Sequence, residues 1–249
     1  MVNGSLEATM RSAGLQDPPR TRAGQGLALL ALAAAAWAVT AVRMDGMDAG
    51  PGTDLGGLGW FMGVWIAMTL AMMLPATVPA AASLPRGSVV PFLATYAGAW
   101  AAAGLVAYVL VEGVRSLELG FLAWDEAGRH VAGGAIVAAA LYQLTPAKDT
   151  CLRRCRAPAE VEYGVWCVGC TWALMGALFA LGVMSVGWMV VLAALIGAER
   201  LLPWRTAAVR GVAVVLVALG IAVALVPEDV PGLTIPGEDH DMQQMEMHR

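Results

Sequence analysis

Four cysteines and a group of methionines are the residues of this 249-residue chain that could hold a metal ion. The cysteines are Cys151, Cys155, Cys167 and Cys170, and all of them fall within twenty consecutive positions. Positions i and i+4 share one face of a helix, so the first pair can point the same way, while the second pair forms a C-x-x-C motif. Thiolates are the preferred ligands of Cu(I) and good ligands of zinc. The pattern therefore predicts a metal site, with Cu(I) as the expected metal and zinc as the alternative.

Other roles for the cysteines stay open at this point. Two thiol pairs could exchange electrons in a thiol–disulfide oxidoreductase, cysteines near a membrane surface can carry acyl chains, and cysteine also packs as a small apolar residue. Basic residues in the same stretch favour metal binding, because neighbouring cations lower thiol pKa values and stabilise thiolates. These residues are Lys148, Arg153, Arg154 and Arg156.

The fourteen methionines are unevenly distributed and supply a second kind of soft ligand. Thioether sulfur binds Cu(I) and hardly binds zinc, although methionine is also a common filler of apolar cores. Met68, Met72, Met73 and Met175 fall within apolar stretches, and we predict them as membrane-embedded metal ligands. A further group lies in the C-terminal segment and could receive the metal or serve only as a solubilising terminus: His240, Met242, Met245, Met247 and His248.

The composition indicates an integral membrane protein. Apolar residues make up 59% of the chain, charged residues only 14%, and the mean hydropathy is +0.67. A helix needs roughly 20 apolar residues to cross a hydrocarbon core of ~30 Å. We therefore predict an all-α fold, a polytopic transmembrane helical bundle of about seven spans. The predicted spans are residues 26–43, 60–82, 90–112, 130–145, 164–184, 186–202 and 206–226.

Local signals mark a short helix between the fourth and fifth spans. Thr145 can cap its N-terminus, Pro146 suits the first helical position, and Pro158 would stop the helix. The first cysteine pair lies on this helix, and the second pair lies at the start of the fifth span. In the second span, Pro75 and Pro79 are expected to kink or end the helix.

The distribution of charge orients the chain. With a cytoplasmic N-terminus and alternating spans, eleven of the fifteen basic residues fall on the cytoplasmic side, as the positive-inside rule favours. We therefore predict a multi-pass protein of the cell inner membrane, with its thiols in the reducing cytoplasm, where a structural disulfide is not expected. The predicted regions are a disordered cytoplasmic segment at 1–24, a transmembrane domain at 25–226 with a cysteine-containing cytoplasmic loop at 146–163, and an acidic extracytoplasmic tail at 227–249.

Several classes of protein are excluded by what the sequence lacks. It contains no nucleophile–base arrangement and no pair of catalytic carboxylates in a plausible site, so we do not expect an enzyme. It contains no phosphate-binding loop, so the chain itself does not drive transport with ATP. No basic groove or nucleic-acid motif is visible either. The expected partners are a copper ion and the lipid bilayer, and no nucleic acid.

The sequence also resembles a bacterial family of predicted metal-binding integral membrane proteins, one member of which serves as a copper chaperone beside a tyrosinase. The resemblance extends over residues 58–203 and implies that Met72, Met73 and the four cysteines are the metal-binding positions. Thr171 departs from the pattern, because a further cysteine often stands there in the family. The resemblance is carried by "AMMLPATVP" at 71–79, "YQLTPAKDTCLRRCRAP" at 142–158, "GVWCVGCTWALM" at 164–175 and "ERLLP" at 199–203.

Together these observations predict a membrane copper chaperone that takes Cu(I) from the cytosol and passes it to an extracytoplasmic acceptor, such as a copper-dependent enzyme. Two alternatives remain. A membrane thiol–disulfide oxidoreductase would use the two cysteine pairs but would leave the distribution of methionine unexplained. A metal transporter would use the same ligands but would move metal without a protein acceptor.

Overall fold

The structure is a computed structural model, and it describes residues 19–44, 55–117, 127–155, 162–182, 185–231 and 233. Within these residues no strand occurs, so the predicted all-helical class is confirmed. The helices are α2 (Pro19–Met44), α3 (Leu58–Ala81), α4 (Arg86–Ser116), α5 (Arg129–Gln143), α6 (Pro146–Arg154), α7 (Tyr163–Leu181), α8 (Val186–Leu201), α9 (Arg205–Leu225) and the short 3-10 helix η3 (Pro227–Asp229).

Each of the seven predicted spans coincides with one helix. Five of them, α2, α3, α4, α7 and α9, are long and apolar enough to cross a membrane. The helices α5 and α8 contain only 15 and 16 residues, which is short against the roughly 20 residues of an ordinary span. The five long helices indicate a multi-pass membrane protein. The predictions for the two ends of the chain fall largely on residues 1–18 and 234–249, which lie outside the described residues.

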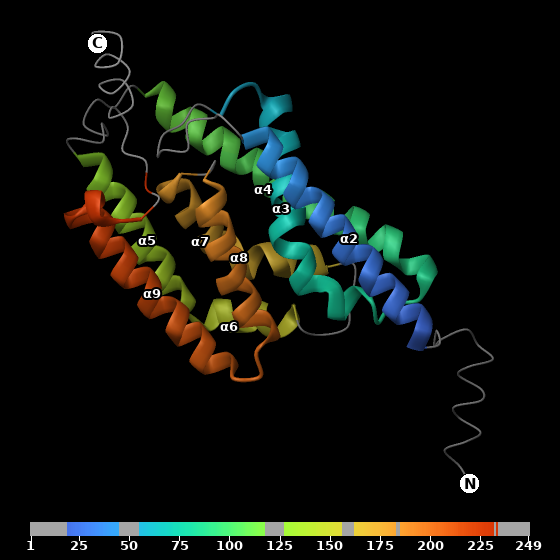
Figure 1. The fold of residues 1–249 in the computed structure, drawn as a ribbon. Coiled ribbons are helices and arrows are strands. Elements are labelled where there is room, and N and C mark those ends of the chain that lie inside the picture. Colours follow the sequence, from blue (N-terminus) through green and yellow to red (C-terminus); the bar gives the residue numbers. More distant parts are fainter. Residues whose placement is uncertain are drawn as a thin grey trace, which may run out of the picture.

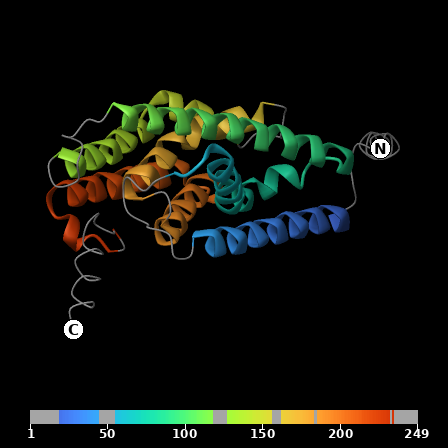
Figure 2. The ribbon, with the colours of Figure 1, turned by 90° about the horizontal axis from the view of Figure 1, so that it is seen from above.

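The helices form two groups joined through a central pair (Figure 1). One group pairs α5 with α9, and the other contains α2, α3 and α4, with α2 packed along α3. Between them lie α7 and α8, as the view from above also shows (Figure 2). Of this pair, α7 contacts α4 and α5, and α8 contacts α3 and α9. The second cysteine pair is therefore carried by a helix with neighbours on several sides.

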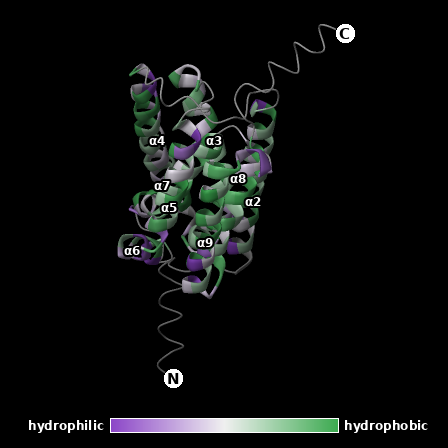
Figure 3. Cartoon of the chain, turned by 90° about the vertical axis from the view of Figure 1, so that its left-hand side faces the viewer, coloured by the Kyte–Doolittle hydropathy of each residue, from purple (hydrophilic) through white to green (hydrophobic). Residues whose placement is uncertain are grey.

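The short helix α6 lies at one end of the bundle and is hydrophilic, whereas the helices around it are largely hydrophobic (Figure 3). Its N-terminus is built as predicted: the Thr145 hydroxyl accepts a hydrogen bond from the Lys148 backbone N–H at 3.3 Å, and Pro146 occupies the first turn. Leu152 is fully buried against the rest of the molecule. The cap stabilises the start of α6, and the helix packs against α7.

Glycine and serine set the boundary between α7 and α8. Gly182 has a φ of 103°, a conformation that residues with a Cβ adopt at a cost, and it ends α7. Ser185 then begins α8, because its hydroxyl accepts a hydrogen bond from the Trp188 N–H at 3.5 Å. In α3, by contrast, Pro75 and Pro79 do not end the helix, which continues to Ala81.

The helices α5 and α9 pack closely because two glycines meet at their crossing. A Cβ placed on Gly133 would lie 2.5 Å from the carbonyl oxygen of Gly220, and a Cβ on Gly220 would lie 2.7 Å from that of Gly133. Such distances are too short for any side chain, so glycine allows the two backbones to approach each other. Small residues have this role in membrane helix packing, where the hydrophobic effect does not drive helices together.

Replacing Gly133 with leucine should separate α5 from α9 and lower the free energy of unfolding by about 1–3 kcal/mol, the usual cost of overpacking. Gly134→Leu is the matched control, because a Cβ at Gly134 meets no atom within 4 Å. Thermal denaturation of both variants in detergent tests this. Equal melting temperatures for the two variants would contradict the assigned contact.

Candidate metal-binding site

Three of the four thiols meet where α6 abuts α7. Cys167 and Cys170 stand one helical turn apart near the start of α7, and both are fully buried. Cys155, the residue that ends α6, places its sulfur 3.4 Å from the sulfur of Cys170. On the far side, the Tyr96 hydroxyl of α4 lies 3.3 Å from the sulfur of Cys167. Thiols carried by two different helices are thus brought together.

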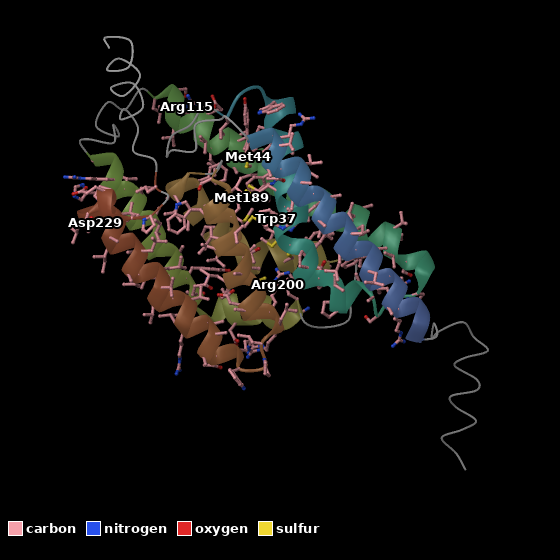
Figure 4. All side chains as sticks on the ribbon, in the orientation of Figure 1. Trp37, Met44, Arg115, Met189, Arg200 and Asp229 are labelled. Carbon is pink, nitrogen blue, oxygen red and sulfur yellow. The ribbon has the colours of Figure 1, made fainter. Side chains whose placement is uncertain are left out.

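A single arginine, Arg200 near the end of α8, holds two of these thiols. Its Nη2 donates hydrogen bonds to the sulfur of Cys167 at 2.9 Å and to the sulfur of Cys170 at 3.1 Å. The side chain is only 6% exposed. Arg200 is marked in Figure 4. In the sequence, Arg200 is one of the eleven basic residues expected on the cytoplasmic side, and no local signal assigns it to the thiols.

The fourth thiol has a different environment. Cys151 is half-buried, and its sulfur would lie 2.9 Å from a Cβ on Gly169, so it packs directly against the backbone of α7 between the two cysteines of the C-x-x-C motif. The Tyr142 hydroxyl donates a hydrogen bond to the carbonyl oxygen of Gly169 at 2.6 Å, at the same place. Cys151 therefore lies beside the cluster, one turn of α6 before Cys155.

The basic residues that the sequence placed near the thiols are mostly engaged elsewhere. Arg153 pairs with Asp149 on the exposed face of α6. The guanidinium of Arg154 lies 4.8 Å from the ring centre of Trp166. Arg156 lies outside the described residues. None of the described arginines of α6 therefore replaces Arg200 as the cation at the thiols.

The prediction that all thiol pKa values are lowered is wrong for the two cysteines at the end of α6. Burial raises the pKa of the Cys151 thiol, and the nearby Cys170 adds to this effect. Hydrogen bonds with Cys167 and Cys170 raise the pKa of the Cys155 thiol, and burial adds to them. Both groups thus favour the protonated thiol in the absence of metal.

A buried ion pair joins the three helices that carry the cluster. The Lys148 ammonium of α6 lies 2.7 Å from a carboxylate oxygen of Glu199 in α8, and each side chain is 1% exposed. The same ammonium also donates a hydrogen bond to the carbonyl oxygen of Cys170 in α7. From the first turn of α6, Lys148 therefore contacts both α7 and α8. The sequence alone predicts no role for Glu199.

The predicted methionine ligands all lie inside the bundle. Met68, Met72, Met73 and Met175 are between 0% and 3% exposed and belong to the same buried cluster as the cysteines. Met189 of α8 is buried as well, and in Figure 4 it lies between Arg200 and Met44. Burial of this kind fits both core packing and metal binding, so the ligand role remains a prediction. Met184 and the Met and His residues of the C-terminal segment lie outside the described residues.

The thiols are held by hydrogen bonds and are not spaced as they would be around a metal. Among the described residues, no three His, Cys, Asp or Glu side chains are arranged to hold a metal ion as they stand. Two sulfurs each about 2.3 Å from one metal in a tetrahedral site stand about 3.8 Å apart, whereas the sulfurs of Cys155 and Cys170 are 3.4 Å apart. Binding therefore requires a small separation of the thiols.

A comparison with known protein families finds one match. The family PpoB2, described as a copper chaperone, matches residues 62–223 of the chain. The chain belongs to this copper chaperone family. The matched residues include all four cysteines and the ion pair below them, so the resemblance read from the sequence is confirmed. Searches of curated proteins and of solved structures find no match to the chain.

Removing one partner of the buried ion pair leaves an uncompensated charge, and we expect Lys148→Met or Glu199→Leu to lower the free energy of unfolding by about 3–5 kcal/mol. The double variant should lose less than the sum, because it removes both charges. Thermal denaturation in detergent measures this. Arg153→Met is the control, because the exposed Arg153–Asp149 pair should contribute only about 0–1 kcal/mol. Additive losses in the double variant would contradict the pairing.

Proposed function

We propose that this protein binds Cu(I) at Cys155, Cys167 and Cys170 and passes it on to an acceptor. The observation that carries the proposal is the convergence of three thiols from α6 and α7 in a chain of a copper chaperone family. Sulfur is the ligand type that Cu(I) prefers. Cys151 is the fourth ligand of the proposed set, at the edge of the cluster. If the metal is bound by the thiols without the methionines, zinc is the alternative ion.

The proposed route leads from the thiols into the bundle. Met68, Met72 and Met73 of α3 and Met175 of α7 are the ligands proposed for the later part of the route. Their support is that they are buried in helices long enough to span a membrane. Thioethers bind Cu(I) but hardly bind zinc, so this part would admit copper and hold back zinc.

The proposed orientation follows the positive-inside rule. The N-terminus and α6 face the cytoplasm, the C-terminus faces outward, and the protein resides in the cell inner membrane with seven crossings. The thiols then lie in a reducing compartment. The acceptor on the other side is a copper-dependent extracytoplasmic enzyme, and the chain itself acts as a carrier and not as an enzyme.

Replacing all four cysteines with serine should abolish high-affinity Cu(I) binding by the purified protein. Among single variants, Cys167→Ser and Cys170→Ser should weaken Cu(I) binding more than Cys151→Ser, because the first two thiols are fully buried at the centre of the cluster. Competition with a chromophoric Cu(I) chelator under reducing conditions measures this. Wild-type binding by the four-serine variant would refute the proposal. A disulfide that forms and breaks in living cells, detected by alkylation, would favour the oxidoreductase instead.

Replacing Met72 and Met73 with leucine should leave copper binding at the thiols intact and slow its passage by about tenfold or more, the usual effect of altering a metal site. The test uses sealed vesicles with the thiol end outside and the metal-free form of a copper-dependent enzyme enclosed in the lumen as the acceptor. Met62→Leu is the control, because Met62 is not among the predicted ligands. Equal delivery by the Met72/Met73 variant and the wild type would rule out this route. Rapid delivery by the wild type without any protein acceptor would favour a transporter.

A further inference from the structure

A small polar cavity lies where the end of α5, the start of α6 and the start of α9 meet, at one end of the bundle (Figure 1). Its volume is about 290 Å³, roughly ten times the ~30 Å³ that one water molecule takes up in the liquid. No cysteine lines it, so it is distinct from the thiol cluster. Its lining includes Gln143 of α5, Lys148 and Asp149 of α6, and Arg205 and Arg210 of α9.

The lining of the cavity is positively charged. It contains three cations, Lys148, Arg205 and Arg210, and a single carboxylate, that of Asp149. Lys148 is already paired with Glu199 at 2.7 Å. One oxygen of Asp149 lies 3.0 Å from Arg205, while the other pairs with an arginine on the exposed face of α6. No acidic group among the described residues pairs with Arg210, so this cation is left for an anion from outside the chain.

The start of α9 adds backbone donors to the lining. No described side chain caps this helix, and the first N–H that bonds along it is that of Ala208, which donates to the Trp204 carbonyl oxygen at 2.9 Å. The N–H groups of residues 205–207 therefore have no helical acceptor. The first turn contains no acidic residue and carries Arg205, the opposite of the charge that the helix dipole favours there. Such an N-terminus is suited to a bound anion.

The Gln143 side chain is an independent sign of a missing ligand. It lines the cavity and is only 2% exposed, and neither its amide nitrogen nor its amide oxygen has a hydrogen-bond partner among the described residues. A buried amide without partners is destabilising. A phosphate oxygen can accept a hydrogen bond from the amide nitrogen, and a hydroxyl group can donate one to the amide oxygen. The unpartnered amide therefore fits a ligand that carries both a phosphate and a hydroxyl group.

The cavity lies at the level expected for lipid headgroups. One of the five helices long enough to cross a membrane, α9, begins beside it. Trp204, directly before α9, is 72% exposed, and tryptophan is enriched where a span meets the membrane surface. Leu144 lines the cavity, and Leu141 stands one turn earlier on the same face of α5, with both side chains exposed. An apolar surface for acyl chains thus continues from the cavity along α5. Basic pockets between transmembrane helices bind phospholipid headgroups at this level.

We propose that this cavity binds the headgroup of phosphatidylglycerol, an anionic phospholipid with hydroxyl groups. The phosphate accepts hydrogen bonds from Arg210 and from the N–H groups at the start of α9, and a glycerol hydroxyl donates to Gln143. Phosphatidylcholine has the same phosphate, but it lacks the hydroxyl groups and its own cation is repelled by the lining. The bound lipid contacts α5, α6 and α9 together, and so stabilises the position of the helix that carries Cys151 and Cys155. The inference does not use the metal-binding role of these thiols.

The test compares the binding of phosphatidylglycerol and phosphatidylcholine to the full-length, copper-free protein in detergent, by native mass spectrometry. The wild type should bind one phosphatidylglycerol more tightly than phosphatidylcholine. Arg210→Gln should weaken phosphatidylglycerol binding by about tenfold or more, the effect of losing one hydrogen bond to a charged group. Arg154→Gln is the matched control, because Arg154 stacks on Trp166 at the same end of the molecule and does not line the cavity. This control should bind like the wild type.

Gln143→Leu separates the loss of a ligand contact from misfolding. In detergent without lipid, this variant should melt no lower than the wild type, because it removes a buried amide that has no partner. Phosphatidylglycerol should raise the melting temperature of the wild type, since a ligand stabilises the folded state that binds it. The same lipid should raise the melting temperature of Gln143→Leu by less.

The outcomes distinguish the sources of the phosphate. Equal affinity of the wild type for the two lipids, or equal losses of phosphatidylglycerol binding in Arg210→Gln and Arg154→Gln, would overturn the inference. Stabilisation by glycerol 3-phosphate as large as that by phosphatidylglycerol would indicate a site for a free phosphate, and would overturn the assignment to a lipid. Phosphatidylglycerol binding by the variant with four serines in place of the cysteines would support the lipid site even if the proposed function failed.

Discussion

The ion pair between Lys148 and Glu199 is the interaction on which the thiol site depends. It is closed off from solvent, and the same ammonium also reaches the carbonyl oxygen of Cys170. One side chain thus fixes α6 against α7 and α8 together. Buried pairs of this kind add little net stability but are costly to break, so they favour one arrangement over its alternatives. With α6 fixed in this way, the sulfur of Cys155 faces that of Cys170, and α8 presents Arg200 to the two thiols of α7.

Much of the fold could be predicted from the sequence, because it depends on local signals. Apolar stretches located the five long helices and the shorter α5 and α8, and Thr145 with Pro146 located the start of α6. The residues around the thiols were not predictable in this way. Arg153 and Arg154 contact Asp149 and Trp166 instead of the thiols, whereas Arg200 reaches the sulfur of Cys167 from a position 33 residues away. A charged pair such as Glu199 and Arg200 at the end of an apolar stretch was the one available signal.

The two kinds of sulfur ligand differ in how much the structure adds to the sequence. For the thiols, the hydrogen bonds of Cys167 and Cys170 show a polar cluster inside an apolar bundle, which simple packing of cysteine would not require. For Met68, Met72, Met73 and Met175, burial is equally typical of residues that only fill space. The proposed role of the thiols therefore rests on contacts in the structure, whereas the proposed role of the methionines rests on the chemistry of thioether sulfur.

The absence of a side chain at Gly169 affects the order in which an incoming molecule reaches the four thiols. Because this glycine has no side chain, Cys151 can rest against the backbone between Cys167 and Cys170 while staying half-exposed. The other three sulfurs are sealed inside the protein. A molecule approaching from the α6 end therefore meets one accessible sulfur first and the enclosed ones afterwards. A single turn of α6 separates the accessible thiol of Cys151 from the enclosed thiol of Cys155.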